Sequence, residues 1–176
     1  MAGEVNIRRA TLGDEAALSL VGQATFLETF AGVLDGAAIV GHCAGAHGAA
    51  RYRDWLEDPR AGAWLVEAPA GGAPVGYLVI APPDLAAANP DEDLELKRIY
   101  LLGRYQGNGT GKRLLAQAVE FARATGAVRL LLGVYAGNEA ALGFYLKQGF
   151  SHVAERTFHV GGKAYDDHVL ALRLGT

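Results

Sequence analysis

The stretch LELKRIYLLGRYQGNGTGK, residues 94–112, decides how this chain folds. Its apolar residues 99–102 predict the end of a strand, and the glycine-rich residues 106–111 predict a turn that leads directly into a helix. The first backbone N–H groups of a helix lack intrahelical partners, and the helix dipole adds partial positive charge there. The turn therefore predicts a site for a phosphate-bearing ligand.

The spacing of this turn excludes two common phosphate-binding motifs. A P-loop needs a glycine five residues before Gly111 and a hydroxyl residue after Lys112, but the chain has Gln106 and Arg113 there. The dinucleotide fingerprint G-x-G-x-x-G fails because its third glycine is missing in either frame. The pattern that fits is Q/R-x-x-G-x-G/A, read through Gly109. Alone it also fits an ordinary strand-to-helix turn, because glycine is common in turns.

A second stretch, residues 133–150 (GVYAGNEAALGFYLKQGF), fits the pattern N-x-x-A-x-x-F-Y-x-x-x-G-F. Together the two stretches resemble the GNAT acetyltransferase superfamily, in which the first pattern is the acyl-CoA pyrophosphate loop. The resemblance extends over residues 4–174. The chain is also similar, more narrowly, to PaiA-type polyamine acetyltransferases at residues 26–30 (FLETF), 94–100 (LELKRIY) and 132–135 (LGVY).

Composition indicates one globular domain over residues 1–176, with 51% hydrophobic and 20% charged residues. The net charge of −3 argues against a nucleic-acid partner and is compatible with a cationic substrate. The single cysteine, Cys43, excludes an internal disulfide and fits a reducing compartment. No apolar run approaches the length of a membrane span, and the N-terminus has no apolar signal core, so the expected location is cytoplasmic.

Hydrophobic spacing and chain breakers predict the order of the elements. Strands are expected at residues 4–10, 63–68, 75–81, 94–102, 128–135, 150–160 and 164–174, with the last two joined as a hairpin. Helices are expected at residues 11–30, 47–56, 112–125 and 138–148. Residues 35–48, rich in Gly and Ala, are expected to form a loop, with a weak helix as the alternative. The order predicts an α+β fold, a mostly antiparallel sheet of about 6–7 strands with helices on both faces.

The resemblance implies acetyl-CoA as cosubstrate, with no metal. It places the cosubstrate between strands 94–102 and 128–135, a central parallel pair that splays apart in GNAT folds. The implied contacts are Gln106, Gly107, Asn108, Gly109, Thr110, Gly111 and Lys112 to the pyrophosphate, the backbone of Ile99, Tyr100 and Leu101 to pantetheine, and Asn138 and Tyr145 to the rest of the arm. Lys112 could instead face solvent, the side chains of 99–101 could be core, and Asn138 could simply cap its helix.

Two residues are the catalytic candidates. Tyr145 lies seven residues after Asn138, on the same helical face, where a phenol can protonate the departing CoA thiolate. Its alternative role is a core aromatic. Glu95 is the candidate base, because an amine must lose a proton before it attacks; otherwise it is a strand residue paired with a lysine. Other relatives carry a glutamate on the next strand, where this chain has Gly133. Water chains, Tyr100 and Tyr135 are further routes for the proton.

The acceptor site is the least determined part. The resemblance places it beside the first helices, where Glu28, Phe30 and Asp35 are candidates. The acidic residues 91–93 and 166–167 could attract a polyamine or could simply be solvated. His42, Cys43 and His47 are too few for a zinc site.

The sequence thus predicts an acetyl-CoA-dependent N-acetyltransferase acting on a primary amine of a small molecule, with a polyamine as the first choice. An amino acid, a peptide N-terminus or an antibiotic amine is the alternative acceptor. A non-catalytic acyl-CoA-binding sensor is the alternative function, and a homodimer is one assembly that the resemblance allows.

Overall fold

A computed structural model of the protein describes residues 3–175. Seven strands form one sheet in the order β1-β2-β3-β4-β5-β7-β6. The strands are β1 (Asn6–Arg9), β2 (Gly62–Glu67), β3 (Pro74–Ala81), β4 (Asp93–Leu101), β5 (Arg129–Tyr135), β6 (Ser151–Val160) and β7 (Lys163–Arg173). The helices are α1 (Glu15–Phe30), α2 (Gly36–Ala46), α3 (Ala49–Glu57), α4 (Thr110–Ala124) and α5 (Glu139–Lys147), with a 3₁₀ turn at Gly103–Tyr105.

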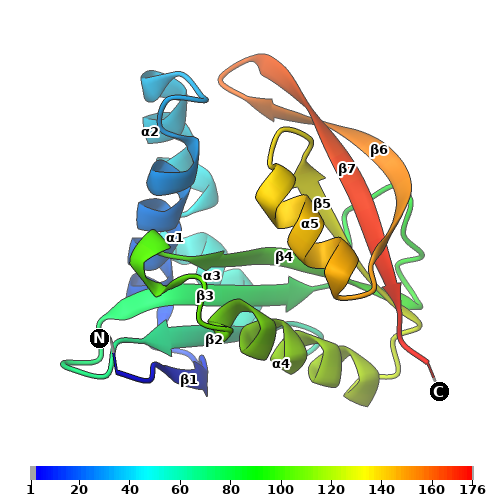
Figure 1. The fold of residues 1–176 in the computed structure, drawn as a ribbon, viewed down its shortest axis with the longest axis horizontal. Helices are drawn as coiled ribbons and strands as arrows, with labels where there is room; N and C mark the ends of the chain where they lie inside the picture. The colour runs from blue at the N-terminus through cyan, green and yellow to red at the C-terminus, as the bar shows by residue number, and fades with distance from the viewer. Residues whose placement is uncertain (1–2, 176) are drawn as a thin grey trace.

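The predicted α+β class and the splayed central pair are confirmed. All neighbouring strands are antiparallel except β4 and β5. These two pair only where residues 93–95 face residues 129–131, although β4 continues to Leu101 and β5 to Tyr135. Beyond the paired end the strands diverge, and Figure 1 shows β5 leaving the direction of β4. The backbone groups of both strands are therefore exposed to whatever lies between them.

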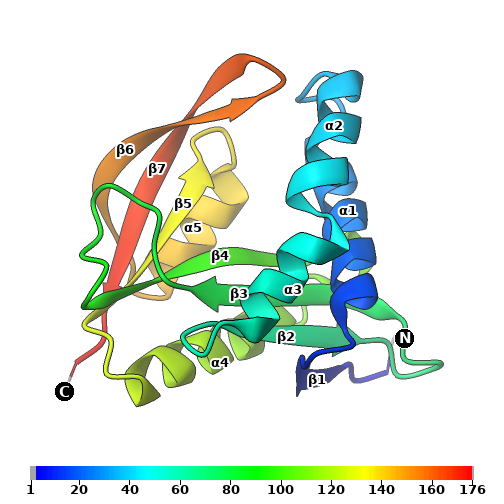
Figure 2. The same cartoon turned by 180° about the vertical axis from the view of Figure 1, so that it is seen from behind.

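Helices cover both faces of the sheet. On one face α4 packs through Leu114, Leu115 and Ala118 into a core shared with β2–β5 (Figure 1). On the other face α1 and α3 pack against β2 and β3, with Leu18 and Tyr52 in that second core (Figure 2). The amphipathic spacing of α4 thus matches its buried face. That of α1 does not, because Leu20 and Leu27 are 62% and 55% exposed.

Residues 35–48 do not form the expected loop, because most of them form helix α2, which was the alternative prediction. The Asp35 side chain caps this helix by accepting a hydrogen bond from the Ala38 N–H at 3.1 Å. The helix buries only Ile39 and Cys43, which pack with Phe26 and with Val160 from the end of β6. The small residues of this segment show no clear helical pattern in the sequence. The tertiary contacts of Ile39 and Cys43 stabilise the helix.

A β-bulge in β4 decides which side chains face each side of the sheet. Val79 of β3 pairs with Arg98 and Ile80 pairs with Leu96, so Lys97 has no residue opposite it. Strict alternation would place Glu95 and Arg98 on opposite faces. The extra residue brings both to the α1–α3 side of the sheet.

Candidate active site

A groove of about 830 Å³ opens where β4 and β5 diverge. Its walls are the open halves of these two strands, the loop from Gly103 to Lys112, one face of α5 and the end of α1. This volume is in the upper part of the range for small-molecule sites. The groove brings together most of the residues that the sequence proposed for acetyl-CoA. Those lining it are Ile99, Tyr100, Leu101, Gln106, Gly107, Gly109, Gly111, Lys112, Asn138 and Tyr145. The acceptor-site candidates Glu28 and Phe30 line it as well.

The loop before α4 has the backbone form that an anion site requires. Gly109 is the N-cap of α4 with φ 82°, and Gly107 has φ 81°, a region that other residues rarely adopt. Asn108 is not among the groove-lining residues, and its Oδ1 instead accepts the Thr110 hydroxyl at 2.6 Å. Within residues 3–175, no acceptor contacts the backbone N–H groups of Gly109, Gly111 or Lys112. Free donors at a helix start fit a pyrophosphate.

Helix α5 presents Asn138 and Tyr145 to the same groove. Asn138 does cap the helix, since its Oδ1 accepts the Ala141 N–H at 3.1 Å, and its side chain also lines the groove. Tyr145 is 8% exposed and packs edge-on against Phe144 and Phe150. Burial raises the pKa of its phenol, so it stays protonated at neutral pH and can donate a hydrogen bond into the groove.

A second cavity of about 290 Å³, here called the side pocket, joins the groove between β4 and β5. The two share Phe30, Lys97, Arg98, Tyr100, Gly133 and Tyr135. Aromatic residues from α1, α3, β6 and β7 line the rest of the side pocket, including Phe26, Trp55, Phe158 and Tyr165. A molecule in the side pocket would therefore meet the groove beside these shared residues of β4 and β5.

Glu95 lines the side pocket, but its carboxylate is already engaged. Its Oε2 accepts the Lys97 ammonium at 2.7 Å and the Asp84 N–H at 2.9 Å. The pairing with a lysine that the sequence offered as the alternative is present, although the side chain is buried and not at the surface. Its role as a base stays a prediction.

Several other acidic candidates have structural roles. Glu28 lines the groove, and its Oε2 accepts the Gly103 N–H at 2.8 Å. Asp35 caps α2 and does not line either cavity, so its assignment to the acceptor site is wrong. Asp93 is 1% exposed and paired with Arg129 at 2.7 Å, so it is no solvated attractor of a polyamine. Of the acidic residues 166–167, only Asp167 reaches the side pocket.

Two arginines that the sequence did not single out also line the side pocket. Arg156 of β6 pairs with Asp167 of β7, its direct cross-strand neighbour, at 2.6 Å. Its guanidinium lies against Gly133, where an added Cβ would collide with it. This arginine occupies the space that a glutamate at position 133 would need. The sequence could have indicated Arg156 only through its pairing with Asp167 across the β6–β7 hairpin, and that pairing is known only once the strand register is known.

Arg98 lines the side pocket, and its hydrogen-bond partners in residues 3–175 are all neutral groups. Its Nη1 donates to the Tyr52 hydroxyl at 2.8 Å and to His47 Nδ1 at 3.0 Å, and its Nη2 donates to the Ala46 carbonyl at 2.7 Å. Because arginine only donates, His47 Nδ1 must be an acceptor and the ring is neutral. Gly22 of α1 makes room for this cluster, since a side chain there would collide with the Tyr52 hydroxyl.

Comparison with known proteins identifies the family. The model of the acetyltransferase (GNAT) family matches residues 36–150. The chain belongs to the GNAT acetyltransferase family. It is 35% identical over 125 residues to an uncharacterized N-acetyltransferase of Mycobacterium bovis, covering 71% of this chain and 75% of that protein. It is 37% identical over 99 residues to the N-alpha-acetyltransferase RimI of Mycobacterium tuberculosis, covering 55% of this chain and 59% of that protein.

Solved structures show the same GNAT fold. The PaiA N-acetyltransferase of Thermoplasma acidophilum, in complex with coenzyme A, has a TM-score of 0.76 at 20% identity and covers 97% of this chain and 99% of its own. The acetyltransferase yncA of Salmonella typhimurium, with its cofactor acetyl-CoA, has a TM-score of 0.68 at 21% identity, covering 99% and 96%. In residues 3–175 of this GNAT chain, no helix is long and apolar enough to cross a membrane.

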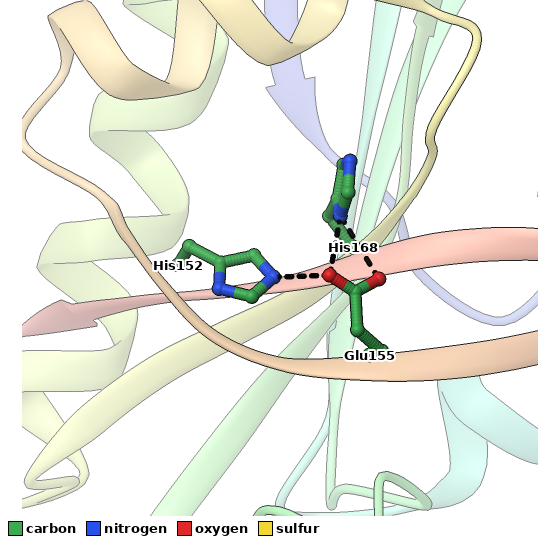
Figure 3. A group of neighbouring side chains, drawn as sticks. All are labelled: His152, Glu155 and His168. Carbon is green, nitrogen blue, oxygen red and sulfur yellow. Dashed lines mark hydrogen bonds and ion pairs between the residues drawn. The ribbon is translucent and has the colours of Figure 1, made fainter.

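This GNAT chain also gathers His152, Glu155 and His168 on β6 and β7, a group that the sequence did not predict. Figure 3 shows both rings directed at the Glu155 carboxylate, with His152 Nε2 at 2.7 Å and His168 Nδ1 at 2.9 Å from Oε1. The three ligand atoms lie within 4.8 Å of one another. Their strand neighbours Arg156 and Asp167 face the side pocket, so this cluster is on the opposite face.

Burial of the neutral His47 predicts a loss of stability in mild acid. Burial, Arg98 and His42 together lower the pKa of His47 to about 3, against about 6.5 in the unfolded chain. As the pH falls from about 6.5 toward 3, the unfolded chain gains a proton that the fold cannot accept, which costs about 1.4 kcal/mol per pH unit. The free energy of unfolding, measured in urea at pH 7.5 and pH 5.0, should fall clearly. His42 adds to this fall, since burial also lowers its pKa.

The control for this prediction is a pair of histidine variants. His47→Gln keeps an oxygen acceptor for Arg98 and should flatten the pH slope, whatever it does to stability at pH 7.5. His159→Gln, at an exposed position of β6, should leave the slope unchanged. An equal slope in the wild type and in His47→Gln would show that other groups carry the acid dependence.

Proposed function

We propose that this GNAT chain transfers the acetyl group of acetyl-CoA directly to a primary amine of a small molecule. The observation that carries the proposal is the junction of the two cavities. A groove with free N–H donors at its phosphate end meets a separate side pocket between β4 and β5. Two reactants can therefore approach each other from different sides of the sheet, as direct transfer requires.

The groove fits coenzyme A by the chemistry of its lining. The free N–H groups near Gly109 and Gly111 would hold the pyrophosphate, with Lys112 beside them. The backbone of β4 from Ile99 to Leu101 has no strand opposite it on the β5 side and would bind the amides of pantetheine. Bound there, acetyl-CoA would supply an acetyl group activated as a thioester. The solved PaiA and yncA structures, which contain coenzyme A or acetyl-CoA, support this assignment.

Catalysis would then need a base on the amine side and an acid on the sulfur side. A C–N bond forms and a C–S bond breaks, while the amine loses a proton and the sulfur gains one. Tyr145 is the proposed acid, since its phenol is protonated and lines the groove. Glu95 is the proposed base, acting directly or through water, because its Oε1 remains available beside the paired Oε2. Free N–H groups of β4 would stabilise the oxyanion.

Calorimetry with coenzyme A and a thiol-release assay test the function together. We expect heat of binding with coenzyme A, and free thiol when acetyl-CoA is supplied with at least one member of an amine panel that includes spermidine, amino acids and a dipeptide. No binding of coenzyme A at millimolar concentration would contradict the enzyme proposal. Tight binding without thiol release across the whole panel would instead favour the acyl-CoA sensor.

A further inference from the structure

The charges that line the side pocket do not suit a polycation. Four cations line it, Arg51, Lys97, Arg98 and Arg156, against the carboxylates of Asp84, Glu95 and Asp167. Lys97 pairs with both Asp84 and Glu95, and Arg156 pairs with Asp167. One lysine thus serves two carboxylates, and the four cations exceed the three carboxylates of the lining by one charge. The ion pairs of the described chain leave Arg98 and Arg51 without a carboxylate.

Arg98 is the centre of this excess positive charge. Three of its five N–H donors go to neutral acceptors, which leaves Nε–H and one Nη2–H without a partner in residues 3–175. Partly buried guanidinium groups are normally paired, because leaving the charge unpaired is costly. The neutral acceptors fix the side chain in one position, so its free donors are ready for an anion.

Arg51 adds a second cation at the same place. Its guanidinium lies 4.5 Å from the centre of the Trp55 ring, and that of Arg98 lies 5.0 Å from the same ring. Both guanidinium groups therefore contact the same indole ring, and both residues line the side pocket. Such an arginine pair matches a carboxylate, which can accept from several N–H groups at once.

The opposite charge is available on the β6–β7 side of the pocket. The Asp167 side chain is 5% exposed, and only its Oδ2 is bound, by Arg156. Its Oδ1 is buried and has no hydrogen-bond partner in residues 3–175. Gly133 lines both the side pocket and the groove, and the Arg156 guanidinium lies against it, so the Arg156–Asp167 pair is next to the junction of the two cavities. An ammonium group is a partner that satisfies such an oxygen.

We propose that the acceptor is a small zwitterionic amine, an amino acid with an apolar side chain. Its carboxylate would bind the free donors of Arg98 with help from Arg51, and its ammonium would lie near Asp167 Oδ1, toward the groove. This inference rests on the proposed acetyl transfer and specifies its acceptor. A polyamine would bring further positive charges next to Arg98 and Arg51, which have no carboxylate partner among the described residues.

The remaining walls specify the rest of the acceptor. Phe26, Phe30, Phe158 and Leu34 contribute apolar surface to the side pocket. Its volume of about 290 Å³ is at the lower end of the range for ligand sites and suits one amino acid better than a longer chain. Apolar side chains should therefore be preferred over charged ones.

A matched series of amines tests the proposal through thiol release from acetyl-CoA. Phenylalanine, phenylalaninamide and phenethylamine share one side chain and differ only in the carboxylate, and leucine, leucinamide and isoamylamine repeat the comparison. We expect kcat/KM for the amino acids to exceed that for the amides and plain amines by about 10- to 100-fold, the effect of a hydrogen-bonded charge. Spermidine should be a poorer substrate than either amino acid.

Substitutions of the arginines test which side chain binds the carboxylate of the acceptor. Arg98→Gln should abolish the preference for the carboxylate, and Arg98→Lys should retain part of it. Arg51→Gln should weaken the preference about 2- to 5-fold, as expected for an exposed charge. The matched control is Arg53→Gln on the same helix, whose side chain pairs with Glu15 outside the pocket and should leave the preference unchanged. If Arg98→Gln binds coenzyme A more weakly than the wild type, the substitution has disturbed more than the acceptor site. The comparison of Arg51→Gln with Arg53→Gln then tests the proposal.

Different results would contradict the zwitterionic acceptor and the acetyl transfer itself. Thiol release with spermidine, a dipeptide or the amides at a rate equal to or above that of the amino acids would overturn the zwitterion proposal and leave acetyl transfer standing. An unchanged preference in both Arg98→Gln and Arg51→Gln would do the same. Absence of thiol release with every amine would instead count against the enzyme.

Discussion

Replacing Tyr145 with phenylalanine should lower kcat by about 10²- to 10⁴-fold, the usual contribution of a general acid. The affinity for coenzyme A should stay almost unchanged, because the ring remains and keeps its contacts with Phe144 and Phe150. The variant loses only the proton that the proposed mechanism delivers to the departing sulfur. Steady-state thiol release and calorimetry with coenzyme A measure the two quantities.

Tyr105→Phe is the matched control, since Tyr105 is equally buried, at 9% exposed, and does not line the groove or the side pocket. It should leave kcat unchanged. The raised pKa of Tyr145 also keeps this group from ionising near neutral pH, so the rate should not fall on its account between pH 7 and 9. Wild-type turnover in Tyr145→Phe would assign protonation of the sulfur to water.

The parts of the site that the sequence predicted are local in the chain. The loop at 106–112 and the segment from Asn138 to Tyr145 each contain their own spacing, so a strand, a turn and a helix start could be placed without any tertiary contact. The β4–β5 divergence came from the family resemblance, because splaying is a property of two strands together. The structure confirms the divergence through the short register of that pair.

The parts that the sequence missed depend on register. The bulge at Lys97 changes the face of Arg98, and nothing in the local residues marks it. Arg156 and Asp167 meet only because β6 and β7 pair at that position. Asp35 is a cap rather than a substrate contact because α2 forms, and α2 forms because Phe26 and Val160 bury its few apolar residues. The face of Arg98, the Arg156–Asp167 pair and the formation of α2 all depend on contacts between residues far apart in the sequence. Local sequence patterns do not contain this information.

The second large effect is expected on stability, from an ion pair at the end where β4 and β5 are still hydrogen-bonded to each other. Asp93 and Arg129 are register partners in the parallel pair, and the guanidinium binds both carboxylate oxygens, at 2.7 and 3.2 Å. Asp93 is 1% exposed. Arg129→Met should lower the free energy of unfolding by about 3–5 kcal/mol, because it leaves a buried carboxylate without its counter-charge. Urea unfolding at pH 7.5 measures this loss.

A double variant separates the charge from the packing. Asp93→Asn combined with Arg129→Met removes both charges and should be more stable than Arg129→Met alone, since a buried amide costs less than a buried carboxylate. Arg113→Met is the control at the surface, where the partner Glu4 is 83% exposed, and should change stability by less than about 1 kcal/mol. Equal losses in Arg129→Met and Arg113→Met would mean that the closed end of the strand pair is held by hydrogen bonds and apolar packing alone. The groove would then owe its shape to the sheet and not to this ion pair.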